Sequence, residues 1–150
     1  MTTDGVKLYF AFRCVEPFAT QLVTDHMTRD GDQWMDDSVE IFMDTRLDKK
    51  TYYQIIVNAA GAVQDLDKGP GRMEGVWNAD IEVAVKKIRG EYHVEAAVTL
   101  ASLGNPSVQS GAKWGLEPLP QPQTGSRRDL LLDLCGPLVP QPGRVRHAGV

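Results

Sequence analysis

Short segments of this chain alternate between apolar and polar side chains, and this alternation constrains the fold more than any other feature of the sequence. A period of two places every second side chain on the same face of an extended strand. The alternating segments are residues 8–15, 38–44, 81–88 and 92–100, and the apolar segment 52–58 is a further strand candidate. No segment before residue 117 sustains the 3.6-residue period of an amphipathic helix. The sequence therefore predicts an all-β fold, an antiparallel β-sandwich of the immunoglobulin-like or jelly-roll-like kind.

Turn residues separate the predicted strands. Gly90 and Glu91 lie between two alternating segments, which is typical of a hairpin. Gly61 allows a tight turn into a further strand at 62–65, and the glycine-rich residues 66–75 predict a loop. The apolar faces predicted to form the core are Leu8, Phe10, Phe12 and Cys14; Val39, Ile41 and Met43; Ile81, Val83 and Val85; and Tyr92, Val94, Ala96, Val98 and Leu100.

Charge and apolar content exclude several classes of function. The net charge is −4 at pH 7, and the chain lacks the basic stripe of a nucleic-acid surface. No apolar run approaches the length of a membrane span, and the first residues lack the apolar core of a signal peptide. The two cysteines, Cys14 and Cys135, could form at most one disulfide bond and have no metal-binding spacing.

The composition changes abruptly after Leu116. Six of the nine prolines lie in residues 117–150, and proline removes the backbone donor that a central strand needs. We therefore predict a folded region at 1–116 and a proline-rich tail at 117–150 that is disordered or out of frame.

The acidic segment 34–44, with the sequence Trp-Met-Asp-Asp-Ser-Val-Glu-Ile-Phe-Met-Asp, resembles the signature of family 9 carbohydrate-binding modules. These modules belong to the wider group of DOMON-like β-sandwiches. Further segments agree in order and spacing: the Leu-Tyr-Phe-Ala-Phe strand, the segment 52–58, Trp77-Asn78, the second half of the predicted hairpin, and Trp114-Gly115-Leu116. The resemblance covers residues 7–116, about three quarters of the chain.

The resemblance implies a set of sugar-binding residues. Trp34 matches a tryptophan that stacks on a sugar ring, Glu40 matches a carboxylate that accepts hydrogen bonds from hydroxyls, and Gln54 and Asn58 match polar positions on the next strand. Ile56 stands where well-studied members have an arginine. As alternatives, Trp34 could cap the core, Glu40 could be solvated, and Gln54 and Asn58 could be ordinary polar strand residues.

Two neighbouring acids and two tryptophans have other readings. Asp36 and Asp37 could stabilise their loop or hold a calcium ion, which is common in the family, although the chain has no EF-hand loop. No cofactor is required for sugar binding. Trp77 and Trp114 are better explained as core residues.

The implied function is non-catalytic binding of a glucan- or xylan-type oligosaccharide. Such modules raise the effective concentration of an attached enzyme at its substrate. The resemblance implies a fragment of an extracellular or cell-surface protein in carbohydrate catabolism, attached to a glycoside hydrolase or a surface domain. We expect the sandwich to be incomplete at both ends, because a one-base frame shift after Leu116 can encode a family-like end and the first strand lacks earlier partners.

Two other functions are alternatives to sugar binding. A glycoside hydrolase needs two carboxylates flanking the scissile bond. The closely spaced acidic residues that could supply them are Asp36, Asp37 and Glu40. A haem-binding DOMON-like domain would ligate iron through methionine and histidine. The residue types for that second rival are supplied by Met27, Met35, Met43, His26 and His93.

Overall fold

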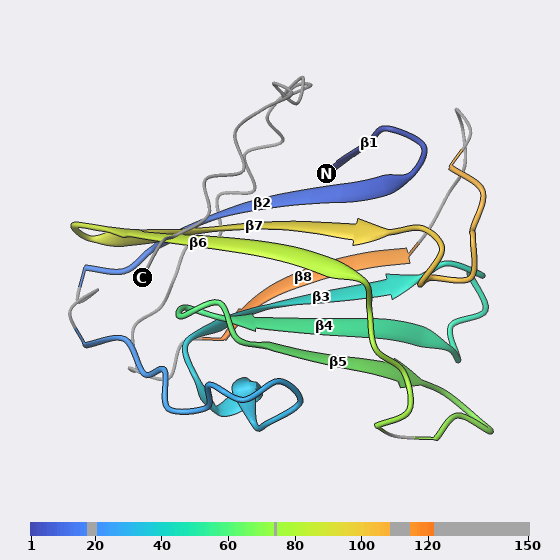
Figure 1. The fold of residues 1–150 in the computed structure, drawn as a ribbon, viewed down its shortest axis with the longest axis horizontal. Helices are drawn as coiled ribbons and strands as arrows, with labels where there is room; N and C mark the ends of the chain where they lie inside the picture. Colours follow the sequence, from blue (N-terminus) through green and yellow to red (C-terminus); the bar gives the residue numbers. More distant parts are fainter. Residues whose placement is uncertain (18–20, 74, 109–114, 122–150) are drawn as a thin grey trace.

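The computed structural model describes residues 1–17, 21–73, 75–108 and 115–121, and these residues form two antiparallel four-stranded sheets (Figure 1). The first sheet has the strand order β1-β2-β7-β6 and the second has the order β5-β4-β3-β8. The elements are β1 (Thr2–Thr3), β2 (Lys7–Val15), the 3-10 helix η2 (Gln33–Met35), β3 (Ser38–Asp44), β4 (Tyr52–Asn58), β5 (Val63–Lys68), β6 (Ile81–Ile88), β7 (Glu91–Thr99) and β8 (Gly115–Gln121). The predicted all-β sandwich is confirmed.

The chain crosses between the sheets through long connections. β3, β4 and β5 follow one another as a meander, and β6 and β7 form the predicted hairpin, with Gly90 at a φ of 81° in its turn. The connection from β2 to β3 passes from the first sheet to the second and contains η2. Residues 21–37 of this connection are called the 21–37 loop below. In the part of the chain that the structure describes, no helix has the length and apolar character of a membrane span.

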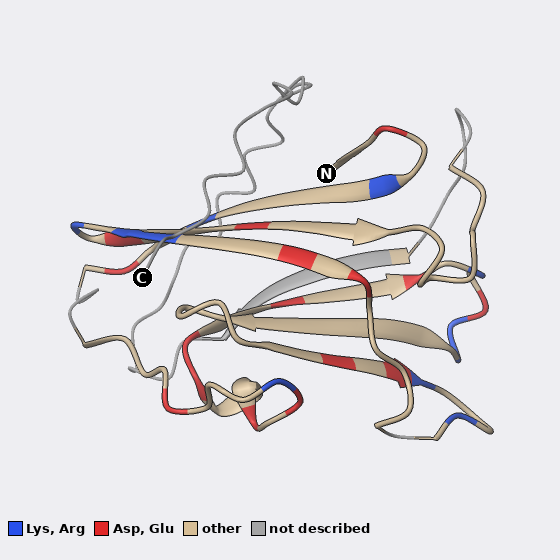
Figure 2. Ribbon diagram, viewed as in Figure 1, with Lys and Arg blue, Asp and Glu red and all other residues tan. Residues whose placement is uncertain are grey.

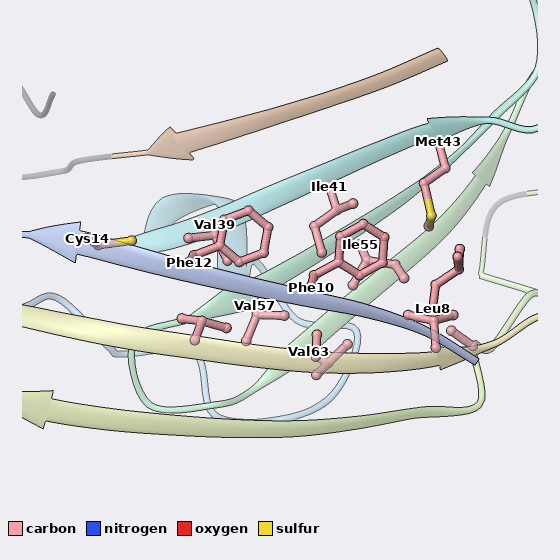
Figure 3. Packing of buried hydrophobic residues seen from close by; sticks show 14 of the residues in the cluster. Leu8, Phe10, Phe12, Cys14, Val39, Ile41, Met43, Ile55, Val57 and Val63 are labelled. Atoms are coloured by element: carbon pink, nitrogen blue, oxygen red, sulfur yellow. The ribbon is translucent and has the colours of Figure 1, made fainter. Parts of the chain in front are cut away.

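The core lies between the inward faces of the two sheets (Figure 3). Alternate residues of β2 and β7 point inward from the first sheet, and alternate residues of β3 and β4 point inward from the second. The buried cluster consists of Leu8, Phe10, Phe12, Cys14, Val39, Ile41, Met43, Ile55, Val57, Ala59, Val63, Ala79, Tyr92, Val94, Ala96, Val98, Leu100 and Leu103. The predicted apolar faces are therefore confirmed, except that Ile81, Val83 and Val85 on the edge strand β6 are only partly buried.

Two boundaries differ from the sequence prediction. β5 runs to Lys68, into the residues expected to be a loop, because Leu66 and Lys68 continue the pairing with β4. β8 runs to Gln121, so five residues beyond Leu116 pair with β3. Trp114, Cys135 and the remaining tail, 122–150, lie outside the described residues.

The position of β8 explains how a strand accommodates Pro118 and Pro120. β8 is at the edge of its sheet, paired only with β3 among the described strands. The two prolines are two residues apart, so their nitrogens point to the same side of the strand. At an edge, that side can face away from the neighbouring strand, and no hydrogen bond of the ladder is lost.

Candidate functional site

The outer face of the second sheet brings two of the predicted site residues together. Val39, Ile41 and Met43 point into the core, so the residues between them on β3 point outward. Gln54, on β4, donates a hydrogen bond of 2.7 Å from Nε2 to Oε2 of Glu40. Glu40 is only 7% exposed, so the solvated-glutamate interpretation is not supported. This hydrogen bond involves neither Oε1 of Gln54 nor Oε1 of Glu40.

Trp34 lies in η2, four residues before β3 begins. Its side chain is held by a hydrogen bond of 3.2 Å from Nε1 to Oδ1 of Asp32. Trp34 is 52% exposed and is not part of the buried cluster, so it does not cap the core. An aromatic ring with this exposure can offer a face to a ligand.

Asn58 is completely buried, in contrast to Gln54. Its Nδ2 donates to Oδ2 of Asp36 over 2.8 Å and to the carbonyl of His26 over 3.0 Å. Its Oδ1 accepts from the backbone N–H groups of Ala60 and Ala62. These contacts engage both polar atoms of the Asn58 amide in fixing the 21–37 loop and the turn after β4.

Asp36 is the centre of this anchor. Its two oxygens accept from the N–H of Asp25, the N–H of His26, Nδ1 of His26 and Nδ2 of Asn58, at distances from 2.8 to 3.1 Å. Burial alone would raise the pKa of the Asp36 carboxyl, but the hydrogen bonds from His26 and Asn58 outweigh burial and lower it. The hydrogen bond to Asp36 also raises the pKa of His26. Sequence reasoning did not predict the contact between His26 and Asp36, because their separation of ten residues matches no known motif.

The same contacts bear on calcium binding. Four donors already use the lone pairs of the Asp36 carboxylate, so this side chain does not fit a calcium ligand as it stands. Asp37 is also buried, and its Oδ2 accepts the N–H of Val23 over 2.9 Å. Among the described residues, no group of three or more His, Cys, Asp and Glu side chains is arranged to hold a metal ion.

A second anchor fixes the tip of the 21–37 loop to β5. Arg29 donates from Nη2 to Oδ2 of Asp65 over 2.9 Å and to the carbonyl of Ala79 over 3.0 Å. The N–H of Ala79 also donates to Asp65. The Asp65 side chain is fully buried, and burial raises its pKa. The two anchors together hold the loop that carries Trp34.

Met43, His93 and His26, three of the residues named for the haem-binding rival, lie in different places in the fold. Met43 is in the core, His93 is on β7 in the first sheet with its Nε2 2.8 Å from Glu91, and His26 is occupied by Asp36 beside the second sheet. Trp77 packs against the core, with its ring centroid 4.7 Å from that of Tyr53.

Comparison with known proteins decides the family. The profile of the family described as "Carbohydrate family 9 binding domain-like" matches residues 4–128. The chain belongs to this family. The family 9-like resemblance of the acidic segment is therefore confirmed.

Solved structures agree with the fold of this family 9-like chain. A crystal structure from Bacteroides uniformis, named a "putative carbohydrate-binding protein", aligns with a TM-score of 0.50 and 16% sequence identity. The alignment covers 75% of this chain and 54% of the other, so the chain spans about half the length of that relative. None of the curated proteins compared with the chain matches it.

Proposed function

We propose that this family 9-like domain binds a neutral oligosaccharide without catalysis, on the outer face of the second sheet. In this proposal, the Glu40 carboxylate accepts hydrogen bonds from the sugar hydroxyls and the Gln54 amide donates to them. Trp34 stacks on a sugar ring. The observation that carries the proposal is the 2.7 Å bond between Gln54 and Glu40, which orients a nearly buried carboxylate and a neighbouring amide on one face.

The chemistry of this pair suits a sugar hydroxyl. A hydroxyl both donates and accepts, so it can bridge a carboxylate oxygen and an amide nitrogen. The carboxylate of Glu40 is already oriented by Gln54, so less rotamer freedom is lost when a ligand binds. Ile56 lies opposite Glu40 on β4 and is apolar. An arginine at this position, as in other members, would supply a bidentate donor. The preferred sugar of this chain should therefore differ from that of arginine-containing members.

Asn58 enters the proposal as a positioning residue. Its amide holds Asp36 and the carbonyl of His26, so it acts on binding through the loop that carries Trp34.

Hydrolysis is the less favoured candidate. A glycosidase needs a carboxylic acid that can give a proton to the leaving group. Hydrogen bonds lower the pKa of Asp36, and its oxygens face N–H donors, so it suits an ionised structural role. Release of reducing sugar from a glucan or xylan by the purified protein would revive the hydrolase.

The proposal extends to the larger protein in which this domain works. We propose that it works in a larger extracellular or cell-surface protein of carbohydrate catabolism, where a glycoside hydrolase or another surface domain is its partner. The relative from Bacteroides uniformis, nearly twice the aligned length, is compatible with such a parent.

Titration calorimetry with gluco- and xylo-oligosaccharides tests the site. We expect Trp34→Ala to weaken binding by about 0.5–1.5 kcal/mol or more, because one stacking surface is lost. We expect Glu40→Gln to weaken it as well, since a charged acceptor makes a stronger hydrogen bond than a neutral one.

Met35→Ala is the matched control, because Met35 is the next residue of η2 and is 46% exposed. It should leave the affinity unchanged. Unchanged affinity in both site variants, with the fold retained by circular dichroism, would remove Trp34 and Glu40 from the binding site.

A further inference from the structure

An aromatic pair lies on the same outer face as Glu40 and Gln54. Phe42 follows Glu40 by two residues on β3, so both point to the same side of the sheet. Phe42 pairs with Gln54 in the register of β3 and β4, and Tyr52 precedes Gln54 by two residues on β4. The rings of Phe42 and Tyr52 have centroids 5.8 Å apart and planes tilted by 50°.

The exposure of β4 increases toward this pair. On the outward-facing positions of β4, Ile56 is 1% exposed, Gln54 is partly buried and Tyr52 is 36% exposed. The face therefore opens in the direction that leads away from η2. Neither ring belongs to the buried core cluster, so the sandwich does not use this aromatic surface for its interior.

The spacing of the pair suits a ligand with more than one ring. Same-side neighbours on a strand are about 7 Å apart, and neighbouring strands are about 5 Å apart. One step along β3 from Glu40 to Phe42 thus covers roughly the length of one sugar residue. Aromatic faces attract the C–H faces of a pyranose, and neither member of the pair carries a charge.

We infer that Phe42 and Tyr52 form a second contact surface, which takes the next neutral sugar residue of a chain lying along β3. The inference rests on the proposed function, because the first sugar residue is the one held at Glu40 and Gln54. The ligand class is then an oligosaccharide of two or more neutral residues rather than a single sugar.

Calorimetry with glucose, xylose and their β-1,4-linked di-, tri- and tetrasaccharides tests this inference. The wild-type protein should bind the trisaccharide about tenfold more tightly than the monosaccharide. In Tyr52→Ala the ratio of these two affinities should fall by roughly two- to tenfold, because one aromatic contact is lost. Tyr52→Phe keeps the ring and should keep the ratio.

Further variants guard against a purely structural effect. Phe42→Leu keeps apolar volume without a flat ring and should lower the same ratio. Ile88→Ala, at a 39% exposed position of β6 on the other sheet, should leave every affinity unchanged.

The outcomes separate this inference from the proposed function. A wild-type protein that binds mono- and trisaccharide equally well would overturn the second surface and leave the first site standing. An unchanged ratio in both Tyr52→Ala and Phe42→Leu would do the same. A protein that binds none of these sugars would overturn both the proposed function and the inference.

Discussion

His26 is the residue whose charge connects pH to the loop that carries Trp34. Its Nδ1 lies 2.9 Å from Oδ1 of Asp36, and its backbone N–H also donates to that carboxylate. The hydrogen bond to Asp36 is the main reason why the pKa of His26 is raised above 6.5, and the negative charges of Asp36, Asp32 and Asp25 act in the same direction. The protonated ring therefore stabilises the folded loop.

The sign of the pH dependence follows from that direction. The pKa of His26 is higher in the folded than in the unfolded chain, so its contribution is fully present below about pH 6.5 and is lost as the pH rises through the folded pKa. We expect the free energy of unfolding of the wild type to fall toward that of His26→Gln between about pH 6 and pH 9. Urea unfolding of both proteins across this range measures the difference, and parallel curves would contradict the prediction.

At the scale of elements, the 21–37 loop depends on buried charge at its second anchor. The Asp65 side chain is fully buried, and Arg29 supplies its positive partner at 2.9 Å. Removal of the guanidinium leaves Asp65 with the N–H of Ala79 and close to the Asp30 carboxylate. A buried carboxylate without a cation is costly.

Arg29→Ala should therefore lower the free energy of unfolding by about 1–3 kcal/mol at pH 7. The loss should shrink as the pH falls, because the pKa of Asp65 is raised and the protonated carboxyl no longer needs a cation. Arg89→Ala, at an exposed position in the turn of the β6–β7 hairpin, is the control and should have little effect. A loss that is the same at pH 4 and pH 7 would argue against an electrostatic role.

The strands of this fold could be predicted from the sequence better than the contacts of the 21–37 loop. Period-two alternation located β2, β3, β6 and β7 to within a residue or two, since the inner face of each strand must be apolar. The pairing of Gln54 with Glu40 is likewise consistent with polar residues at outward positions. Alternation could not predict that Asn58 and Asp36 are interior, because their partners lie on a loop whose path has no periodicity. Residues 117–121 of β8 were assigned to the proline-rich tail for a similar reason, since prolines indicate an edge strand only once the strand order is known.

At the scale of the whole molecule, the most completely buried side chains lie between the central strands of the two sheets. Ile41 on β3 is 0% exposed, whereas Ile81 on the edge strand β6 only packs against the margin of the core. The edge strand β6 also carries positive charge near the turn of the β6–β7 hairpin, where Lys86 and Lys87 lie (Figure 2). Charged residues of this kind on an edge strand discourage pairing with other chains.

Substitution of the two isoleucines should reveal this difference. Ile41→Ala should cost about 2–5 kcal/mol, because a cavity remains between the sheets. Ile81→Ala removes the same atoms from a partly solvated site and should cost less than half as much. Chemical denaturation of both variants measures the two losses, and equal losses would mean that the edge strand is packed as tightly as the centre.

Pro118 and Pro120 have a consequence that reaches beyond one molecule. An ordinary edge strand offers alternating amide hydrogens and carbonyl oxygens to any strand that approaches it. At these two positions of β8 the edge has no amide hydrogen to offer, so an approaching strand would lack two hydrogen bonds of its ladder. Copies of this chain crowded at high concentration would therefore stay separate along this edge of the second sheet.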